Sequence, residues 1–145
     1  MVLPVSHVGV VSRDATFRER WVGTLNHAAA SDPAGQGVTA VRFLALESGE
    51  SALDCAVHDG LLQGVIIDGV SIDAADALVA HLQGLRAELD LFLAIPRDAG
   101  VTNLPVELLD REENNSNRVL RQVSSAIQRR AHTPFADTLR DYVYS

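Results

Sequence analysis

The stretch Gly64–Ser71, with the sequence GVIIDGVS, decides the fold. Its branched apolar residues Val65, Ile66 and Ile67 run without interruption to Asp68, where the chain passes into a turn. A continuous apolar run is typical of a strand that is covered on both faces, and therefore of a parallel sheet between two layers of helices. Ligands of such sheets bind at the carboxyl ends of the strands, so Asp68 is the first candidate for a functional residue.

Four other apolar stretches have the length of strands and are separated by helical patterns. They are His7–Val11, Val38–Ala45, Leu89–Ile95 and Val106–Leu109. Their order relative to the helical patterns predicts a flavodoxin-like or receiver-like doubly wound α/β domain, with a five-stranded parallel sheet and helices on both faces. We assign residues 1–131 to this domain, place Asp68 at the end of its central strand, and assign residues 132–145 to a linker helix.

Capping residues and apolar periodicity predict the helices. A capping box at Thr16 and Glu19 begins the first helix, and Ser51–Asp59 forms the second. A third helix begins near Ala74, with Ser71 or Asp73 as its cap.

A last helix of the domain begins after the polar break REENNSN, with Ser116 or Asn117 as its cap. Its predicted apolar face consists of Val119, Leu120, Val123 and Ile127. The segment Arg97–Pro105 is too short and too rich in turn residues for a full helix, so the helix before the fifth strand is expected to be lost or reduced to one turn.

Composition excludes several kinds of chemistry. All 12 basic residues among the 145 are arginine, so a phosphate-loop lysine, a Schiff base to pyridoxal phosphate and a lysine base are all impossible in this segment. The net charge of −7 argues against a nucleic-acid partner, and the lack of a long apolar run argues against a membrane span. The start of the sequence lacks the pattern of a signal peptide, so we expect a cytoplasmic protein. The five histidines and Cys55 lack zinc-site spacing, so no metal site is expected.

At the end of the third strand, VIID resembles the phosphoacceptor strand of bacterial response-regulator receiver domains. That family also holds Mg²⁺ with an acidic pair after the first strand. Here Ser12 and Arg13 stand at those positions, and Asp14 is the nearest acid. We therefore expect Arg13 to lie near Asp68 or Asp14 and to take over part of the charge balance.

The receiver resemblance also implies a hydroxyl residue after the fourth strand and a lysine after the fifth. Ala94 or Ile95 occupies the first position, and Asp110 or Arg111 the second. Because only Asp68 remains of the four elements, we expect a degenerate pocket formed by Ser12, Arg13, Asp14 and Asp68 that does not accept a phosphoryl group.

The last segment, HTPFADTLRDYVYS, carries an amphipathic strip after the fold has used its final helix. Phe135, Leu139 and Tyr142 are spaced four and three apart, which places them on one face of a helix. We expect this strip to be an interface, because apolar strips of this kind usually pack on something else. The alternative is a helix that folds back on its own domain.

Within that segment, TPFADTLRDYV resembles the junction between the N-terminal wing domain and the catalytic domain of bacterial ornithine/lysine/arginine decarboxylases. The resemblance implies a non-catalytic domain that contributes to oligomer assembly or regulation. Its partners would be its own downstream catalytic domain and further copies in a homo-oligomer. Pyridoxal phosphate would belong to the parent enzyme, and this segment would hold no cofactor. Two alternatives remain: a stand-alone pseudo-receiver that signals by protein contacts, and a phosphoacceptor receiver that uses Asp68.

Overall fold

The computed structural model describes residues 5–31, 40–99 and 104–129. Its strands are β1 (Val5–Val11), β2 (Ala40–Leu46), β3 (Leu62–Asp68), β4 (Asp90–Ile95) and β5 (Glu107–Asp110). Its helices are α1 (Ala15–Ser31), α2 (Gly49–His58), α3 (Ala75–Leu85) and a further helix over residues 116–129.

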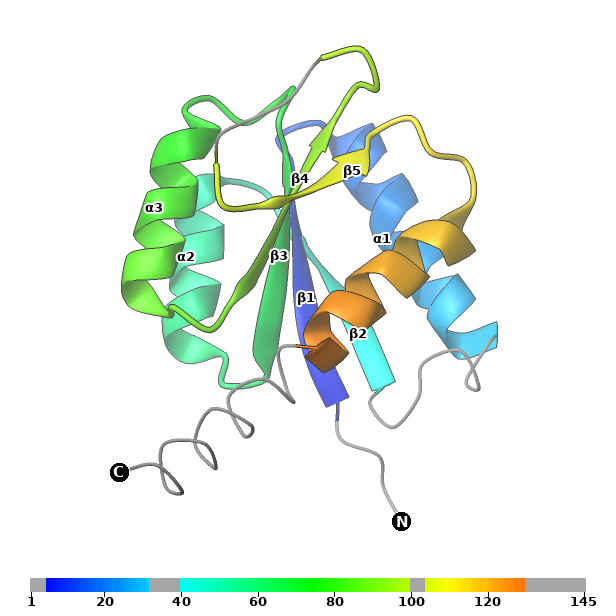
Figure 1. The fold of residues 1–145 in the computed structure, drawn as a ribbon, viewed down its shortest axis with the longest axis horizontal. Helices are drawn as coiled ribbons and strands as arrows, with labels where there is room; N and C mark the ends of the chain where they lie inside the picture. Colours follow the sequence, from blue (N-terminus) through cyan, green and yellow to red (C-terminus); the bar gives the residue numbers. More distant parts are fainter. Residues whose placement is uncertain (1–4, 32–39, 100–103, 130–145) are drawn as a thin grey trace, which may run out of the picture.

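All pairings in the five-stranded sheet are parallel, and the strand order is β2-β1-β3-β4-β5. The chain thus starts near the middle of the sheet, moves to one edge, crosses back over β1 and continues to the other edge (Figure 1). The predicted fold class is confirmed, including the central position of β3 with Asp68 as its last residue.

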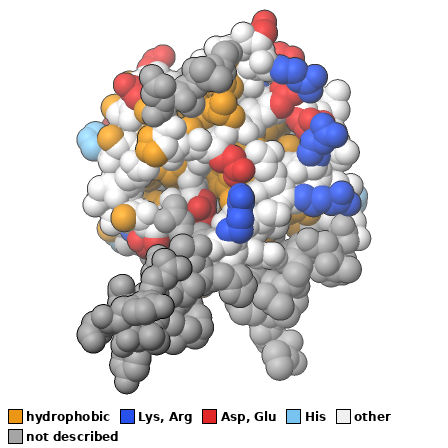
Figure 2. Space-filling view, viewed as in Figure 1, with side chains coloured by type: hydrophobic (Ala, Val, Ile, Leu, Met, Phe, Trp, Pro, Cys, Tyr) orange, Lys and Arg blue, Asp and Glu red, His pale blue; other side chains and the backbone are white. Residues whose placement is uncertain are grey.

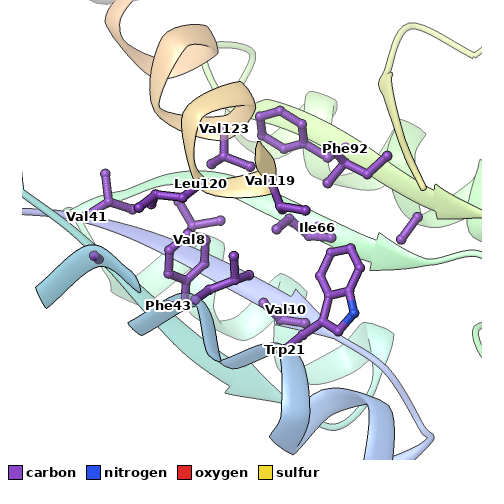
Figure 3. Packing of buried hydrophobic residues seen from close by; sticks show 14 of the residues in the cluster. Val8, Val10, Trp21, Val41, Phe43, Ile66, Phe92, Val119, Leu120 and Val123 are labelled. Atoms are coloured by element: carbon purple, nitrogen blue, oxygen red, sulfur yellow. The ribbon is translucent and has the colours of Figure 1, made fainter. Parts of the chain in front are cut away.

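Helices cover the sheet on both faces, as the continuous apolar strands predicted. On one face α1 and the helix over 116–129 pack on the sheet, and on the other face α2 and α3 do so (Figure 1). Figure 3 shows the first of these two cores, in which Trp21 of α1 and Val123 of helix 116–129 meet strand residues such as Val8 and Phe92. The predicted apolar face of that last helix is confirmed, since all four of its residues are buried.

The caps of α1 and α3 differ from the sequence predictions. Asp14, and not Thr16, caps α1: its Oδ1 accepts hydrogen bonds from the backbone N–H groups of Thr16 (3.0 Å) and Phe17 (3.2 Å). The capping box was wrong because the helix begins at Ala15, one residue before the expected cap. Helix α3 begins after Ala74, which has a left-handed backbone (φ 53°, ψ 48°) and makes no side-chain cap.

Ser71 and Asp73, the predicted caps of α3, therefore do not cap that helix. The last helix starts at residue 116, so its cap is Asn115 and not Ser116 or Asn117. The side chain of Asn115 accepts a hydrogen bond from the N–H of Asn117 at 3.1 Å. In each case the cap lies one or more residues from its predicted position, because the path of the preceding loop decides which side chain faces the free N–H groups.

The described residues between β4 and β5 contain no helix, as the sequence predicted. The domain boundary at residue 131 and the linker helix over 132–145, with Phe135, Leu139 and Tyr142, lie outside the described residues. Within the described ranges, no helix is both long and apolar enough to cross a membrane.

Candidate functional site around Asp68

Asp68 lies at the carboxyl edge of the sheet, between the ends of β1 and β4. Its side chain has no solvent exposure, and neither does that of Ser12, the first residue after β1. Strands β1 and β3 run side by side in parallel, so Ser12 and Asp68 meet at this edge. A buried carboxylate is costly unless every oxygen is paired, and its partners therefore define the site.

Four donors engage the carboxylate of Asp68. Oδ1 accepts hydrogen bonds from Nε of Arg111 at 2.7 Å and from the backbone N–H of Val70 at 3.0 Å. Oδ2 accepts from the hydroxyl of Ser12 at 2.8 Å and from Nη2 of Arg111 at 3.2 Å. An ionised carboxylate offers about four acceptor positions, so these donors fill them.

Arg111 is the central cation of this site. It follows β5, and its backbone N–H extends the β4–β5 ladder by donating to the carbonyl of Ile95 at 2.9 Å. Its guanidinium lies over the ring of Phe17, 4.4 Å from the centroid, and Nη2 is 3.4 Å from Oδ2 of Asp14. The planar group thus contacts two carboxylates and an aromatic face, a combination that a lysine cannot reproduce.

The expected role of Arg13 was wrong. Its Nη1 lies 3.9 Å from the carboxylate of Asp73, and both side chains are largely exposed. Only its backbone takes part in the site, where its N–H donates to the hydroxyl of Ser71 at 2.9 Å. The expected charge balance exists, but Arg111 provides it.

A pair of hydroxyls completes the polar network. Oγ of Ser12 lies 3.0 Å from Oγ of Ser71 and accepts a hydrogen bond from the N–H of Asp14 at 3.0 Å. The two hydroxyls lie within hydrogen-bond distance of each other, and either of them can be the donor. The loops after β1 and β3 are therefore tied together at the carboxylate.

The environment lowers the pKa of Asp68 below its usual value of 3.8. Burial opposes this by disfavouring the charged form, but the hydrogen bonds from Arg111, Ser12, Val70 and Ser71 outweigh it. The pKa of Arg111 is raised, chiefly by its hydrogen bond to Asp68. Asp68 is thus an anion held by a fixed cation at neutral pH.

The side of the site next to β4 carries no hydroxyl. Ala94 is the register partner of Asp68 and is fully buried. Gly69 donates its backbone N–H to the carbonyl of Ala94 at 2.9 Å and passes so close to β4 that a Cβ at this position would lie 2.7 Å from Cγ2 of Ile95. The chain directly after Asp68 therefore packs closely against β4.

The structure brings together three of the four predicted pocket residues, Ser12, Asp14 and Asp68, and leaves out the side chain of Arg13. It adds Arg111 and Ser71. Arg111 carried a signal in the sequence, because it stands where the receiver pattern has a lysine. Ser71 had none, because its role follows from the path of one loop.

No protein-family model matches the chain, and no curated protein matches it. Among solved structures it is similar to a CheY-like response regulator receiver domain protein from Methanospirillum hungatei JF-1. That similarity has a TM-score of 0.62 at 9% identity and covers 88% of this chain and 98% of the other. The chain is also similar to the receiver domain of the hybrid histidine kinase CckA, with a TM-score of 0.51 at 16% identity, over 86% and 98% of the two chains. At these identities the likeness shows the fold, which is that of receiver domains.

Other reactive groups lie apart from this site. The described residues contain no group of three or more His, Cys, Asp or Glu side chains that could hold a metal ion. Burial, followed by the charges of Asp59 and Asp54, raises the pKa of the Cys55 thiol, so the reactive thiolate is disfavoured. On the face shown in Figure 2, acidic side chains lie among the arginines. The side chain of Arg97, which pairs with Asp110, is largely exposed, and ion pairs of this kind contribute little to stability.

Proposed function

We propose that the chain is a pseudo-receiver, a receiver-fold domain that works through contacts with other proteins and does not accept a phosphoryl group. The observation that supports this most directly is the complete engagement of the Asp68 carboxylate by Arg111, Ser12 and Val70. A phosphoacceptor needs a carboxylate oxygen with a free lone pair and access to the donor. Here both oxygens are occupied and the side chain is buried.

The charge pattern supports the same proposal. A receiver site brings several carboxylates around a divalent cation, which neutralises the incoming phosphoryl group. In this chain the guanidinium of Arg111 lies between Asp68 and Asp14, where it supplies the positive charge that those carboxylates need. A divalent cation would have to displace Arg111. It would also lack one acidic ligand, because Ser12 stands at a position where the receiver pattern has an acid.

Incubation of the protein with acetyl phosphate and Mg²⁺, followed by intact-mass measurement, tests the proposal. We expect no gain of a phosphoryl group, while a phosphorylatable receiver domain in the same tube gains one. Asp68→Asn serves as the matched variant. A phosphoryl gain in the wild-type protein that disappears in Asp68→Asn would refute the proposal of a pseudo-receiver. It would support the alternative hypothesis, a phosphoacceptor receiver that uses Asp68.

A narrower proposal names the protein partner of this domain. The likeness of TPFADTLRDYV to the junction of the basic amino-acid decarboxylases supports a wing domain whose partner is its own downstream pyridoxal-phosphate domain. That segment lies outside the described residues, so this proposal rests on the sequence. The parent reading frame tests it: continuation into a catalytic region with a Ser-x-His-Lys motif supports the wing domain, and a stop codon close after Ser145 supports a stand-alone pseudo-receiver.

A further inference from the structure

The side chain of Arg111 crosses the end of β4 to reach Asp68. Arg111 follows β5, and β4 lies between β5 and the central strand β3, which ends at Asp68. Three other carboxylates lie much closer along the chain, at Asp110, Glu112 and Glu113. An arginine side chain has many rotamers, and holding it in one direction costs conformational entropy. A contact other than Asp68 itself is therefore needed to direct the guanidinium inward.

The ring of Phe17, on α1, provides such a contact. The guanidinium of Arg111 lies over this ring, with Cζ 4.4 Å from the ring centroid. The negative face of an aromatic ring attracts a guanidinium, and stacking on the ring orients the guanidinium plane. The ring is fixed in turn, because Phe17 is 3% exposed and its centroid lies 4.8 Å from that of the Trp21 ring. The surface beneath Arg111 thus belongs to the packed core.

The same turn of α1 holds the guanidinium a second time, through Asp14. Oδ1 of Asp14 accepts the hydrogen bonds from the N–H groups of Thr16 and Phe17 that cap the helix. Oδ2 of the same carboxylate lies 3.4 Å from Nη2 of Arg111. One carboxylate therefore fixes the start of the helix and contacts the guanidinium, while Nε and Nη2 of Arg111 donate to Asp68.

We infer that Phe17 is a positioning residue for Arg111, and that the first turn of α1 thereby keeps both carboxylate oxygens of Asp68 engaged, an inference that rests on the proposed function of a site that accepts no phosphoryl group. Hydrogen bonds weaken steeply when the donor turns away from the acceptor, so a guanidinium that leaves the ring loses its short contact with Asp68. A protein that bound α1 and moved its first turn would release Arg111 from Asp68. The site is in this way coupled to the helix that covers it.

The variant Phe17→Leu tests this positioning role, because leucine is apolar and has no aromatic face. Phe92→Leu is the matched control, since it makes the same change to a buried ring of the same core and leaves the ring of Phe17 in place. NMR titration of the side-chain carboxyl groups should give a pKa of Asp68 that is higher in Phe17→Leu than in the wild type, by about half a pH unit. In Phe92→Leu it should stay at the wild-type value.

A second measurement on the same variants follows the arginine itself. Relaxation of the Nε nitrogen should show that Arg111 becomes more mobile in Phe17→Leu and stays rigid in Phe92→Leu. Both readouts are properties of the folded state, so a loss of stability alone does not produce them. A folded Phe17→Leu with the wild-type pKa of Asp68 and the wild-type mobility of Arg111 would overturn the inference.

The wild-type protein gives a test that does not depend on the folding of a variant. Arg97 also donates through Nε to an aspartate, but its side chain is 78% exposed. The order parameter of the Arg111 Nε–H should approach the value of about 0.85 that is typical of rigid backbone, and that of Arg97 should fall below about 0.6. Equal mobility of the two arginines would contradict the positioning by Phe17.

Failure of this inference can be told apart from failure of the proposed function. A phosphoryl gain by Asp68 in the wild-type protein refutes the pseudo-receiver, whatever the NMR measurements show. An unphosphorylated wild type, together with a folded Phe17→Leu that leaves Arg111 and Asp68 unchanged, overturns the role of Phe17 alone.

Discussion

Arg111 and Asp68 form a partly buried ion pair across 43 positions of sequence, with Nε of the arginine 2.7 Å from Oδ1 of the aspartate. The pair joins the end of the central strand to the residue that follows the edge strand β5. It also occupies an acceptor position on each carboxylate oxygen. The same contact therefore bears on stability and on the proposed loss of phosphoryl transfer.

Removal of the cation should destabilise the fold. Arg111→Ala leaves the buried carboxylate of Asp68 with two donors fewer, and we expect a loss of about 2–4 kcal/mol, somewhat less than for a fully buried pair because Arg111 keeps 19% exposure. Urea unfolding monitored by circular dichroism measures it. Arg97→Ala is the control, since it also removes an arginine paired with an aspartate, but the side chain of Arg97 is 78% exposed and water screens its charge. An equal and small effect of the two substitutions would show that the Arg111–Asp68 pair contributes no more than a surface pair.

Acid should weaken the fold through Asp68. The folded-state pKa of this residue is lowered below 3.8, so the unfolded chain takes up the proton first as the pH falls. The contribution of Asp68 is complete well above that value, and it declines from about pH 5 downward until the folded state is protonated too. In Asp68→Asn the free energy of unfolding should fall less steeply over this range. Part of the dependence of the free energy of unfolding on pH should remain in this variant, because the pKa values of Asp59 and Asp110 are also lowered. An unchanged slope in the variant would mean that Asp68 has its ordinary pKa in the folded protein.

The sheet was predictable because each strand carries its own signal. Uninterrupted apolar runs such as Gly64–Ile67 indicated burial on both faces, and that property with the alternating helices leaves few topologies. Asp68 could be placed at the functional edge for the same reason. The partner of Asp68 could not be predicted, because sequence spacing does not say which of two arginines reaches the carboxylate. Arg13 is close along the sequence of the first loop but points to Asp73, whereas Arg111 is directed inward by the ladder that β5 forms with β4.

The helix caps and the contact of Asn26 on α1 with Phe43 on the edge strand β2 also depend on tertiary structure. Asp14 caps α1 because the loop after β1 bends at Arg13, and Asn26 reaches Phe43 because α1 packs beside β2. No motif marks either residue, since Asp and Asn are common at many solvent positions. These contacts become visible only when the elements are assembled.

The tail strip yields a prediction that rests on the sequence. Replacing Phe135 and Leu139 with serine should leave the melting temperature of the domain nearly unchanged and abolish any self-association that depends on the tail. A fully buried aromatic or leucine side chain contributes roughly 1.5–3 kcal/mol, so the strip gains from packing on a partner. Thermal unfolding and sedimentation of the double variant measure the two effects. Unfolding of the domain by the double substitution would mean that the tail belongs to its own core.

Two glycines should respond in opposite directions to replacement by alanine. A Cβ at Gly69 would lie 2.7 Å from Cγ2 of Ile95, 3.1 Å from Cδ1 of Leu93 and 3.3 Å from the carbonyl oxygen of Ala94, so the chain after Asp68 would have to move away from β4. We expect Gly69→Ala to cost about 1–3 kcal/mol, as overpacking of a core does.

Gly84 is the matched control, because it lies in α3 and a Cβ there would meet nothing within 4 Å. Gly84→Ala should stabilise the protein by about 0.5–1 kcal/mol, since alanine loses less backbone entropy than glycine on entering a helix. Urea unfolding of both variants and of the wild type measures the sign of each change in the free energy of unfolding. A neutral Gly69→Ala would mean that the turn after Asp68 can move away from β4, and the hydrogen bond from Val70 to Asp68 would then be adjustable as well.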